Sequence, residues 1–144
     1  MSVLGAGTAA IGLRPKLDEA AVWCAVCRRR PDDRVFGELF HFVVSLAVAV
    51  YYAAGFQLLG ATSHLWAWGA LGGVIHWLVG GAYMAFVPQM RLRSGTAFAA
   101  PGAFAIGLGR RDLIGFLVAH LAYGVVFGIS YGILHSQGGP ALAL

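Results

Sequence analysis

The chain has 144 residues, of which 59% are hydrophobic and only 11% are charged, and its mean hydropathy is +0.75. This composition excludes an ordinary soluble domain and is typical of a small protein embedded in a lipid bilayer. The net charge of +4 does not indicate nucleic-acid binding, because the basic residues cluster beside apolar segments.

The N-terminal segment, residues 1–35, is predicted to be a partial or interfacial helical segment. Residues 1–13 are apolar and small, but a membrane span needs about 20 such residues. They fit either the latter half of a longer first helix or an apolar terminus at the membrane surface. Residues 16–30 have acidic residues near the start and arginines at the end, which suits a short interfacial helix with Trp23 at headgroup depth.

Cys24 and Cys27 form a C-x-x-C pair within this segment. The sequence has no second pair, so a four-cysteine zinc or redox site would have to be shared across a dimer. The two residues are too close together to staple the fold. We therefore expect reduced cysteines that act as small apolar residues, with no metal site.

Three later segments are apolar and long enough to cross a bilayer, at about 39–59, 65–87 and 112–134. They make residues 36–134 a predicted transmembrane helix bundle. The connection between the first two is too short to be anything but a hairpin turn, so these helices should be antiparallel. The bundle has four helices if residues 1–13 belong to another crossing. Residues 135–144 are expected to form a flexible tail.

Small and polar residues lie along one side of each predicted span. Spacings of three and four residues place side chains on one face of an α-helix, and small residues let helices approach closely in membranes. We expect a helix-packing, polar core formed by His41, Ser45, Gly72, His76, Gly80, His120, Gly124, Gly128 and Gly132. Three helices cannot fill every such groove among themselves, which favours self-association or a larger complex.

The long connection, residues 88–111, has an apolar middle that contains Pro101. Such a segment is predicted to lie in the interface or to dip into the bundle, since backbone exposed to lipid leaves amides unpaired. If three spans cross alternately, one side of the membrane holds Arg28, Arg29, Arg30, Arg34, Arg91, Arg93, Arg110 and Arg111. The positive-inside bias makes that side cytoplasmic and places the C-terminus outside.

Three histidines, His41, His76 and His120, fall within the spans. All three should point into the bundle, because an imidazole exposed to hydrocarbon is costly. Their positions predict a staggered line, with His76 and His120 about one helical turn apart in depth.

Three interpretations of these histidines stay open. They form hydrogen bonds that pack the helices together; or they relay protons or a small solute, with Glu38 at the cytoplasmic mouth; or His76 and His120 bind haem b. The sequence offers no Ser/His/Asp set, no paired carboxylates for one site and no phosphate-binding glycine loop, so we expect no enzyme.

The order of several features is distinctive: His41-Phe42 near the start of a helix, a glycine-rich second span that ends in Val87-Pro88, and then the motif His120-x-x-Tyr123-Gly124-x-x-x-Gly128-x-x-Tyr131-Gly132. Over about residues 36–134 this order resembles the YagU-like family of small bacterial inner-membrane proteins. The resemblance implies a four-helix membrane protein with no established chemistry, in which the first helix precedes or overlaps residues 1–13.

We therefore predict an all-α protein of the bacterial inner membrane, without a cofactor and with the lipid bilayer as its surroundings. Its expected role is that of a non-enzymatic component that self-associates or serves as an accessory subunit of a membrane complex. The alternatives are a haem b electron-transfer subunit and a histidine-lined pathway for protons or a small solute.

Overall fold

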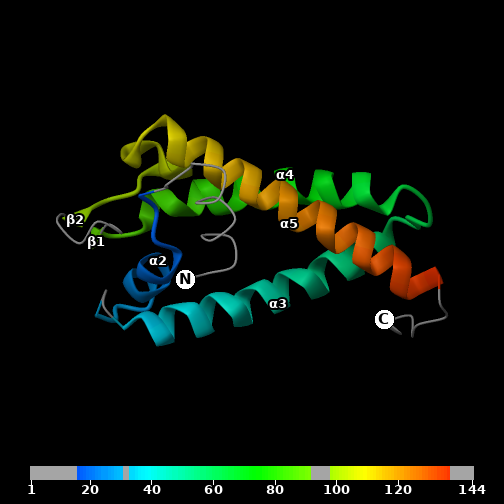
Figure 1. The fold of residues 1–144 in the computed structure, drawn as a ribbon, viewed down its shortest axis with the longest axis horizontal. Coiled ribbons are helices and arrows are strands. Elements are labelled where there is room, and N and C mark those ends of the chain that lie inside the picture. Colours follow the sequence, from blue (N-terminus) through cyan, green and yellow to red (C-terminus); the bar gives the residue numbers. More distant parts are fainter. Residues whose placement is uncertain (1–15, 31–32, 92–97, 137–144) are drawn as a thin grey trace.

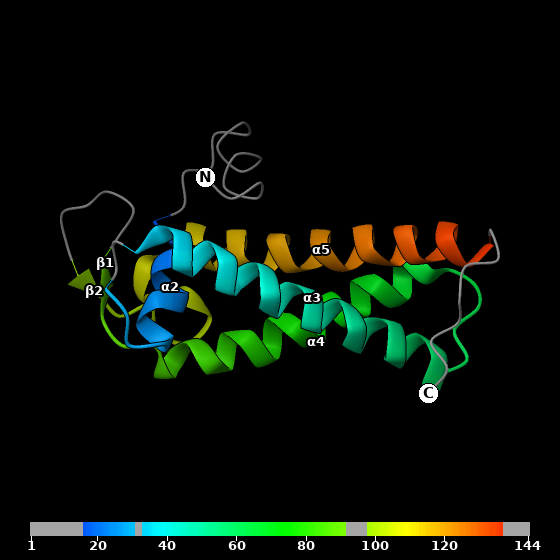
Figure 2. The ribbon, with the colours of Figure 1, turned by 90° about the horizontal axis from the view of Figure 1, so that it is seen from below.

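The computed structural model describes residues 16–30, 33–91 and 98–136. Over these residues the fold is a bundle of long helices with shorter elements gathered at one end (Figures 1 and 2). The elements in chain order are α2 (Glu19–Val26), α3 (Arg34–Leu58), α4 (Leu65–Tyr83), the 3-10 helix η1 (Met84–Phe86), β1 (Met90–Arg91), β2 (Phe98–Ala99), the 3-10 helix η2 (Ala103–Leu108) and α5 (Arg110–Ser136).

The prediction of an all-α membrane protein with a short N-terminal helix is confirmed. Among the described residues, three helical segments are long and apolar enough to cross a membrane, namely α3, α4 with η1, and α5. The predictions for residues 1–13 and for most of the tail lie outside the described residues. The helix α5 continues to Ser136, so it extends two residues past the expected boundary.

Local interactions explain where α3 begins, where α4 ends and how the turn between them is shaped. The helix α3 begins earlier than predicted because the Asp33 carboxylate accepts a hydrogen bond from the backbone N–H of Phe36 at 3.4 Å. The helix α4 tightens into η1 before Pro88, because proline cannot donate the next helical hydrogen bond. His64 and Gly60, both with positive φ, shape the turn that joins α3 to α4.

The antiparallel helices α4 and α5 touch along their backbones. A Cβ atom built on Gly69 would collide with the carbonyl oxygen of Gly124, and one built on Gly128 would collide with that of Leu65. A Cβ on Gly73 would lie 2.6 Å from the carbonyl oxygen of His120, closer than real contacts allow. Only glycine fits here, so the glycine ladder on α5 packs inside the chain against α4.

The helix α3 stands farther from this pair, as the cyan to green helix in Figure 1 shows. Large aromatic side chains bridge the distance: the ring centroids of Tyr52 and Phe127 are 5.4 Å apart, as are those of Phe56 and Tyr131. The Tyr123 hydroxyl donates a hydrogen bond of 2.7 Å to the backbone carbonyl of Ser45. Contact between α3 and α5 is therefore made by side chains.

The best-buried apolar cluster lies at the end that α2 and the long connection cover. Its buried members are Leu17, Ala21, Val22, Ala25, Met84, Val87, Met90, Ala105 and Leu108. Two carboxylates anchor this end: Asp18 pairs with Arg34 at 2.8 Å, and Asp112 accepts a hydrogen bond of 2.8 Å from the backbone N–H of Leu17. The long connection thus folds back onto the bundle.

Trp23, which is predicted to lie at headgroup depth, is partly buried against α3. Its ring packs on those of Phe40 and His41 of α3, with centroids 5.5 and 6.1 Å away. The cause is the close docking of α2 on α3, where a Cβ atom on Gly37 would collide with the backbone of Ala20. This contact turns the indole toward α3.

Candidate functional site

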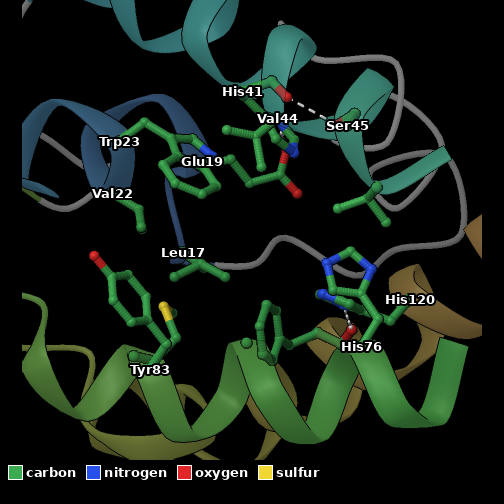
Figure 3. Close-up of a pocket in the computed structure, with 14 residues that line it drawn as sticks. Leu17, Glu19, Val22, Trp23, His41, Val44, Ser45, His76, Tyr83 and His120 are labelled. Carbon is green, nitrogen blue, oxygen red and sulfur yellow. Dashed lines mark hydrogen bonds and ion pairs between the residues drawn. The ribbon is translucent and has the colours of Figure 1, made fainter. Parts of the chain in front are cut away.

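A cavity of about 140 Å³ lies between α2, α3, α4 and α5, next to the covered end of the bundle (Figure 3). Its volume is close to the roughly 150 Å³ of an engineered protein cavity that holds one benzene molecule. Apolar side chains make most of the wall. The polar part comes from Glu19, His41, Ser45, His76, Tyr83 and His120.

Glu19 and His41 form one side of the cavity. The carboxylate Oε2 of Glu19 lies 3.6 Å from Nδ1 of His41, and both side chains are partly buried. Glu19 reaches this position because Asp18 caps α2 and the contact between Gly37 and Ala20 holds α2 against α3. A protonated His41 would form an ion pair with Glu19 here.

His76 and His120 form the opposite side. Their ring centroids are 4.5 Å apart and their planes meet at 72°, which is an edge-to-face contact. Nδ1 of His120 lies 2.8 Å from the carbonyl oxygen of Phe116. Because a carbonyl only accepts, Nδ1 of His120 carries a proton and donates, so Nε2 of the neutral ring is an acceptor.

The Nδ1 atom of His76 is buried and has no hydrogen-bond partner among the described residues. The same is true of Oε2 of Glu19, apart from the 3.6 Å approach of His41. Buried polar atoms without partners are rare in folded proteins, and they commonly mark an ordered water, a bound ion or a functional group. The two atoms belong to facing walls of one cavity.

The predicted polar core is divided between two places. His41, Ser45, His76, Gly80 and His120 line the cavity. The remaining glycines serve helix contacts: Gly72 meets the Tyr52 ring, Gly124 and Gly128 pack on α4, and Gly132 faces the Leu65 side chain.

The rings of His76 and His120 touch, although the residue of α4 that lies level with His120 is Gly73, three positions before His76. The actual register of α4 on α5 is set by the contacts of Gly69 and Gly73 with Gly124 and His120.

The acidic neighbour of His41 is a residue that the sequence did not single out. The structure places Glu19 beside His41, whereas Glu38, the predicted acid at the mouth, is not among the residues that line the cavity. The sequence signal for Glu19 was its position in the first turn of a helix that follows a capping aspartate. The packing of α2 against α3 brings Glu19 to His41, and no pattern in the sequence predicts this packing.

The rings of His76 and His120 lie closer together than the two axial imidazoles of a haem. Metal–imidazole bonds are about 2 Å long and a ring's centre lies about 1 Å behind its nitrogen, so two imidazoles on opposite sides of one iron have centres about 6 Å apart. The centroids of His76 and His120 are only 4.5 Å apart in a crossed arrangement. Within the described ranges, no group of three or more metal-binding side chains was found.

A line of tyrosine side chains continues from the cavity toward the other end of the bundle. The rings of Tyr52 and Tyr123 contact His76, with centroid distances of 6.4 and 6.2 Å. Beyond them the rings of Phe56 and Phe127 interrupt the polar line, and the Gln57 amide then donates to the Tyr131 hydroxyl at 3.3 Å. An apolar barrier therefore separates the cavity from the far polar groups.

A second, more open groove of about 380 Å³ lies between α3 and α4. Its wall is mainly aliphatic and aromatic, with contributions from Tyr51, Phe56, Trp68 and Ile75. His76 borders both this groove and the cavity. The imidazole thus stands in the wall between the two spaces.

One member of the cysteine pair, Cys24, packs inside the protein. Cys24 is buried and its thiol donates to the carbonyl oxygen of Asp33 at 3.2 Å. Burial, together with the nearby charge of Asp33, raises the pKa of the Cys24 thiol. A thiol of raised pKa is a poor nucleophile at neutral pH, so Cys24 acts as a small buried residue.

Comparison of the chain with protein-family models, with curated proteins and with solved structures found no match.

Proposed function

We propose that this protein is a non-enzymatic, multi-pass membrane protein that takes up and relays protons. The route would be the cavity of about 140 Å³ that His41, His76 and His120 line, which we call the histidine cavity. The observation that carries the proposal is the facing arrangement of Glu19 and His41 on one side and His76 and His120 on the other. Histidine changes its charge near physiological pH, and ionisable groups inside a membrane usually mark ion or proton routes. The cavity is large enough for several water molecules to bridge these groups.

The relay would run from the partly exposed side chains of Glu19 and His41 as far as His76. Beyond it, the apolar barrier of Phe56 and Phe127 would have to separate before a proton could reach Tyr131. The helix α3 is suited to this movement, because it meets α5 through side chains only. We therefore propose a gated relay with α3 as the moving part.

The orientation in the membrane follows from charge. The starts of α3 and α5 and the strand β1, with Arg34, Arg110 and Arg91, lie at the same end of the bundle (Figure 2). The positive-inside bias would place this end in the cytoplasm of a bacterium, in the inner membrane, with the C-terminal end outside. Glu19 and His41 would then take up protons from the cytoplasm.

Proton flux into vesicles tests the proposal. The purified protein is reconstituted in liposomes with a pH-sensitive dye and a potassium diffusion potential. We expect proton uptake above that of protein-free liposomes, and a loss of at least about fivefold in His76→Gln. His64→Gln is the matched control, because His64 is exposed in the α3–α4 turn. Equal flux in wild type and His76→Gln would refute the relay.

A role as a self-associating protein or accessory subunit is the second candidate. The groove between α3 and α4 supports it, because its wall is apolar and could receive a helix. The glycine ladder does not support it, since α4 and α5 use those glycines themselves. Native mass spectrometry from nanodiscs tests it: a strictly monomeric protein without a bound partner would rule it out. The resemblance to the YagU-like family stays a prediction.

A further inference from the structure

We propose that the histidine cavity binds a small protonated amine, with ammonium and methylammonium as the fitting sizes. The inference rests on the proposed function in that both concern the same cavity, and it names the ion that the cavity holds. Its basis is a set of hydrogen-bond acceptors that α2, α3, α4 and α5 bring to the wall of one cavity.

The acceptors come from three elements. The Oε2 atom of Glu19 on α2 is buried without a hydrogen-bond partner among the described residues. On α5, Nε2 of His120 is an acceptor because Nδ1 already donates to Phe116. On α3, the Ser45 hydroxyl donates to the carbonyl of His41 at 2.8 Å, which leaves only its lone pairs for a ligand.

His76 adds a fourth polar atom from α4. Its buried Nδ1 has no partner in the part of the chain that the structure describes. In the tautomer that carries the proton on Nε2, this Nδ1 accepts a hydrogen bond. An ammonium group has several N–H donors on one atom, so it can satisfy acceptors that converge from different walls.

The charge of the cavity points to the same class of ligand. Among the described residues that line it, Glu19 is the one carboxylate, and none is a lysine or an arginine. The nearby Arg34 does not neutralise Glu19, because its guanidinium pairs with Asp18. While His41, His76 and His120 are neutral, a cation is therefore favoured over an anion of the same size.

The volume of the cavity and its aromatic lining restrict the class of ligand further. A volume of about 140 Å³ admits a ligand of about six heavy atoms or fewer. The rings of Trp23, Tyr83 and Phe116 line the space and offer faces to a positive charge. His76 also borders the groove between α3 and α4, which gives a small ligand a second approach to the cavity.

Saturation-transfer NMR on the full chain in lipid nanodiscs tests the proposal, with methylammonium as the probe. We expect saturable methylammonium binding that is at least tenfold weaker in Glu19→Gln and about threefold weaker in Ser45→Ala. Glu38→Gln is the matched control, because Glu38 is also a partly buried acid but does not line the cavity. Tetramethylammonium, a cation without N–H donors, should bind at least tenfold more weakly than methylammonium.

Several outcomes would overturn the proposal. They are no saturable methylammonium binding, equal binding of tetramethylammonium, or equal losses in Glu19→Gln and Glu38→Gln. Circular dichroism and the thermal midpoint of each variant show whether it is folded, and Ser45→Ala keeps the test usable if Glu19→Gln is not. Proton flux with no methylammonium binding would refute this inference alone, whereas methylammonium binding without proton flux would refute the relay alone.

Discussion

The two halves of this bundle are held together in different ways. The pair α4–α5 meets backbone to backbone, because glycines such as Gly69 and Gly124 leave no space for a Cβ atom. The helix α3 meets that pair through the long side chains of Tyr52, Phe56 and Tyr123. The first contact is rigid and leaves no room, and the second leaves space that becomes the histidine cavity. The site thus lies where close packing stops.

The contact between α4 and α5 should be disrupted most strongly by a substitution at Gly124. In Gly124→Val the added side chain would collide with the backbone of Gly69, which cannot move aside, so we expect a loss of about 3 kcal/mol or more in stability. Denaturation in mixed micelles with increasing SDS measures the loss. Gly115→Ala on the same helix is the control, because nothing lies within 4 Å of that position and alanine favours a helix. Equal stability of the two variants would show that α4 and α5 are not in this contact.

The attachment of α2 to α3 should be weaker but still measurable. In Asp18→Ala, α2 loses its N-cap and Arg34 loses its carboxylate partner at 2.8 Å. We expect a loss of about 2 kcal/mol and faster proteolysis near α2, while α4 and α5 stay protected. Uniform loss of protection over all helices would contradict the division of the bundle into two halves.

Substitutions of two tyrosines test how α3 is held against α4 and α5. The Tyr123 hydroxyl donates to the carbonyl of Ser45, so Tyr123→Phe should cost about 1 kcal/mol. The Tyr52 hydroxyl is buried without a partner among the described residues, so Tyr52→Phe should be neutral or slightly stabilising. Thermal unfolding in detergent compares them. A larger loss for Tyr52→Phe would mean that its hydroxyl holds a water or a ligand.

The smallest effect on stability is expected at Cys24, where the property to be measured is the reactivity of the thiol. Burial raises the pKa of its thiol, so less thiolate is present at neutral pH than for an exposed cysteine. We expect alkylation of Cys24 to be at least about tenfold slower than that of the partly exposed Cys27, with the difference lost after unfolding in SDS. Mass spectrometry of the labelled peptides measures both rates. Equal rates in the folded protein would show that α2 detaches readily.

Raising the pH should loosen α2 and so increase the alkylation of Cys24, because the pKa of this thiol is raised in the folded protein. The folded protein holds the thiol proton more tightly than the unfolded chain does, so the thiol favours the folded state less as the pH rises through the unfolded pKa. The docked α2 should therefore loosen in alkaline solution. Hydrogen exchange of α2 amides at pH 8 and pH 10, corrected for the intrinsic rate, checks this expectation.

The sequence by itself determined the membrane-spanning helices and the residues at their small faces. Long apolar segments with few charges have no stable alternative to helices that cross a bilayer, and the spacing of Gly124 and Gly128 fixes which side of α5 admits a close neighbour. It also indicated that His41, His76 and His120 turn inward, because their alternative is hydrocarbon.

Only the tertiary structure decided which groups meet. The contact of His76 with His120 depends on the register of α4 against α5, and a shift of one turn would preserve every face while separating the rings. The meeting of Glu19 with His41 depends on the fold-back of α2, which the packing of Gly37 on Ala20 and the pair of Asp18 with Arg34 stabilise. Periodicity in a sequence encodes the face of each helix, whereas register and docking arise from contacts between residues far apart in the chain.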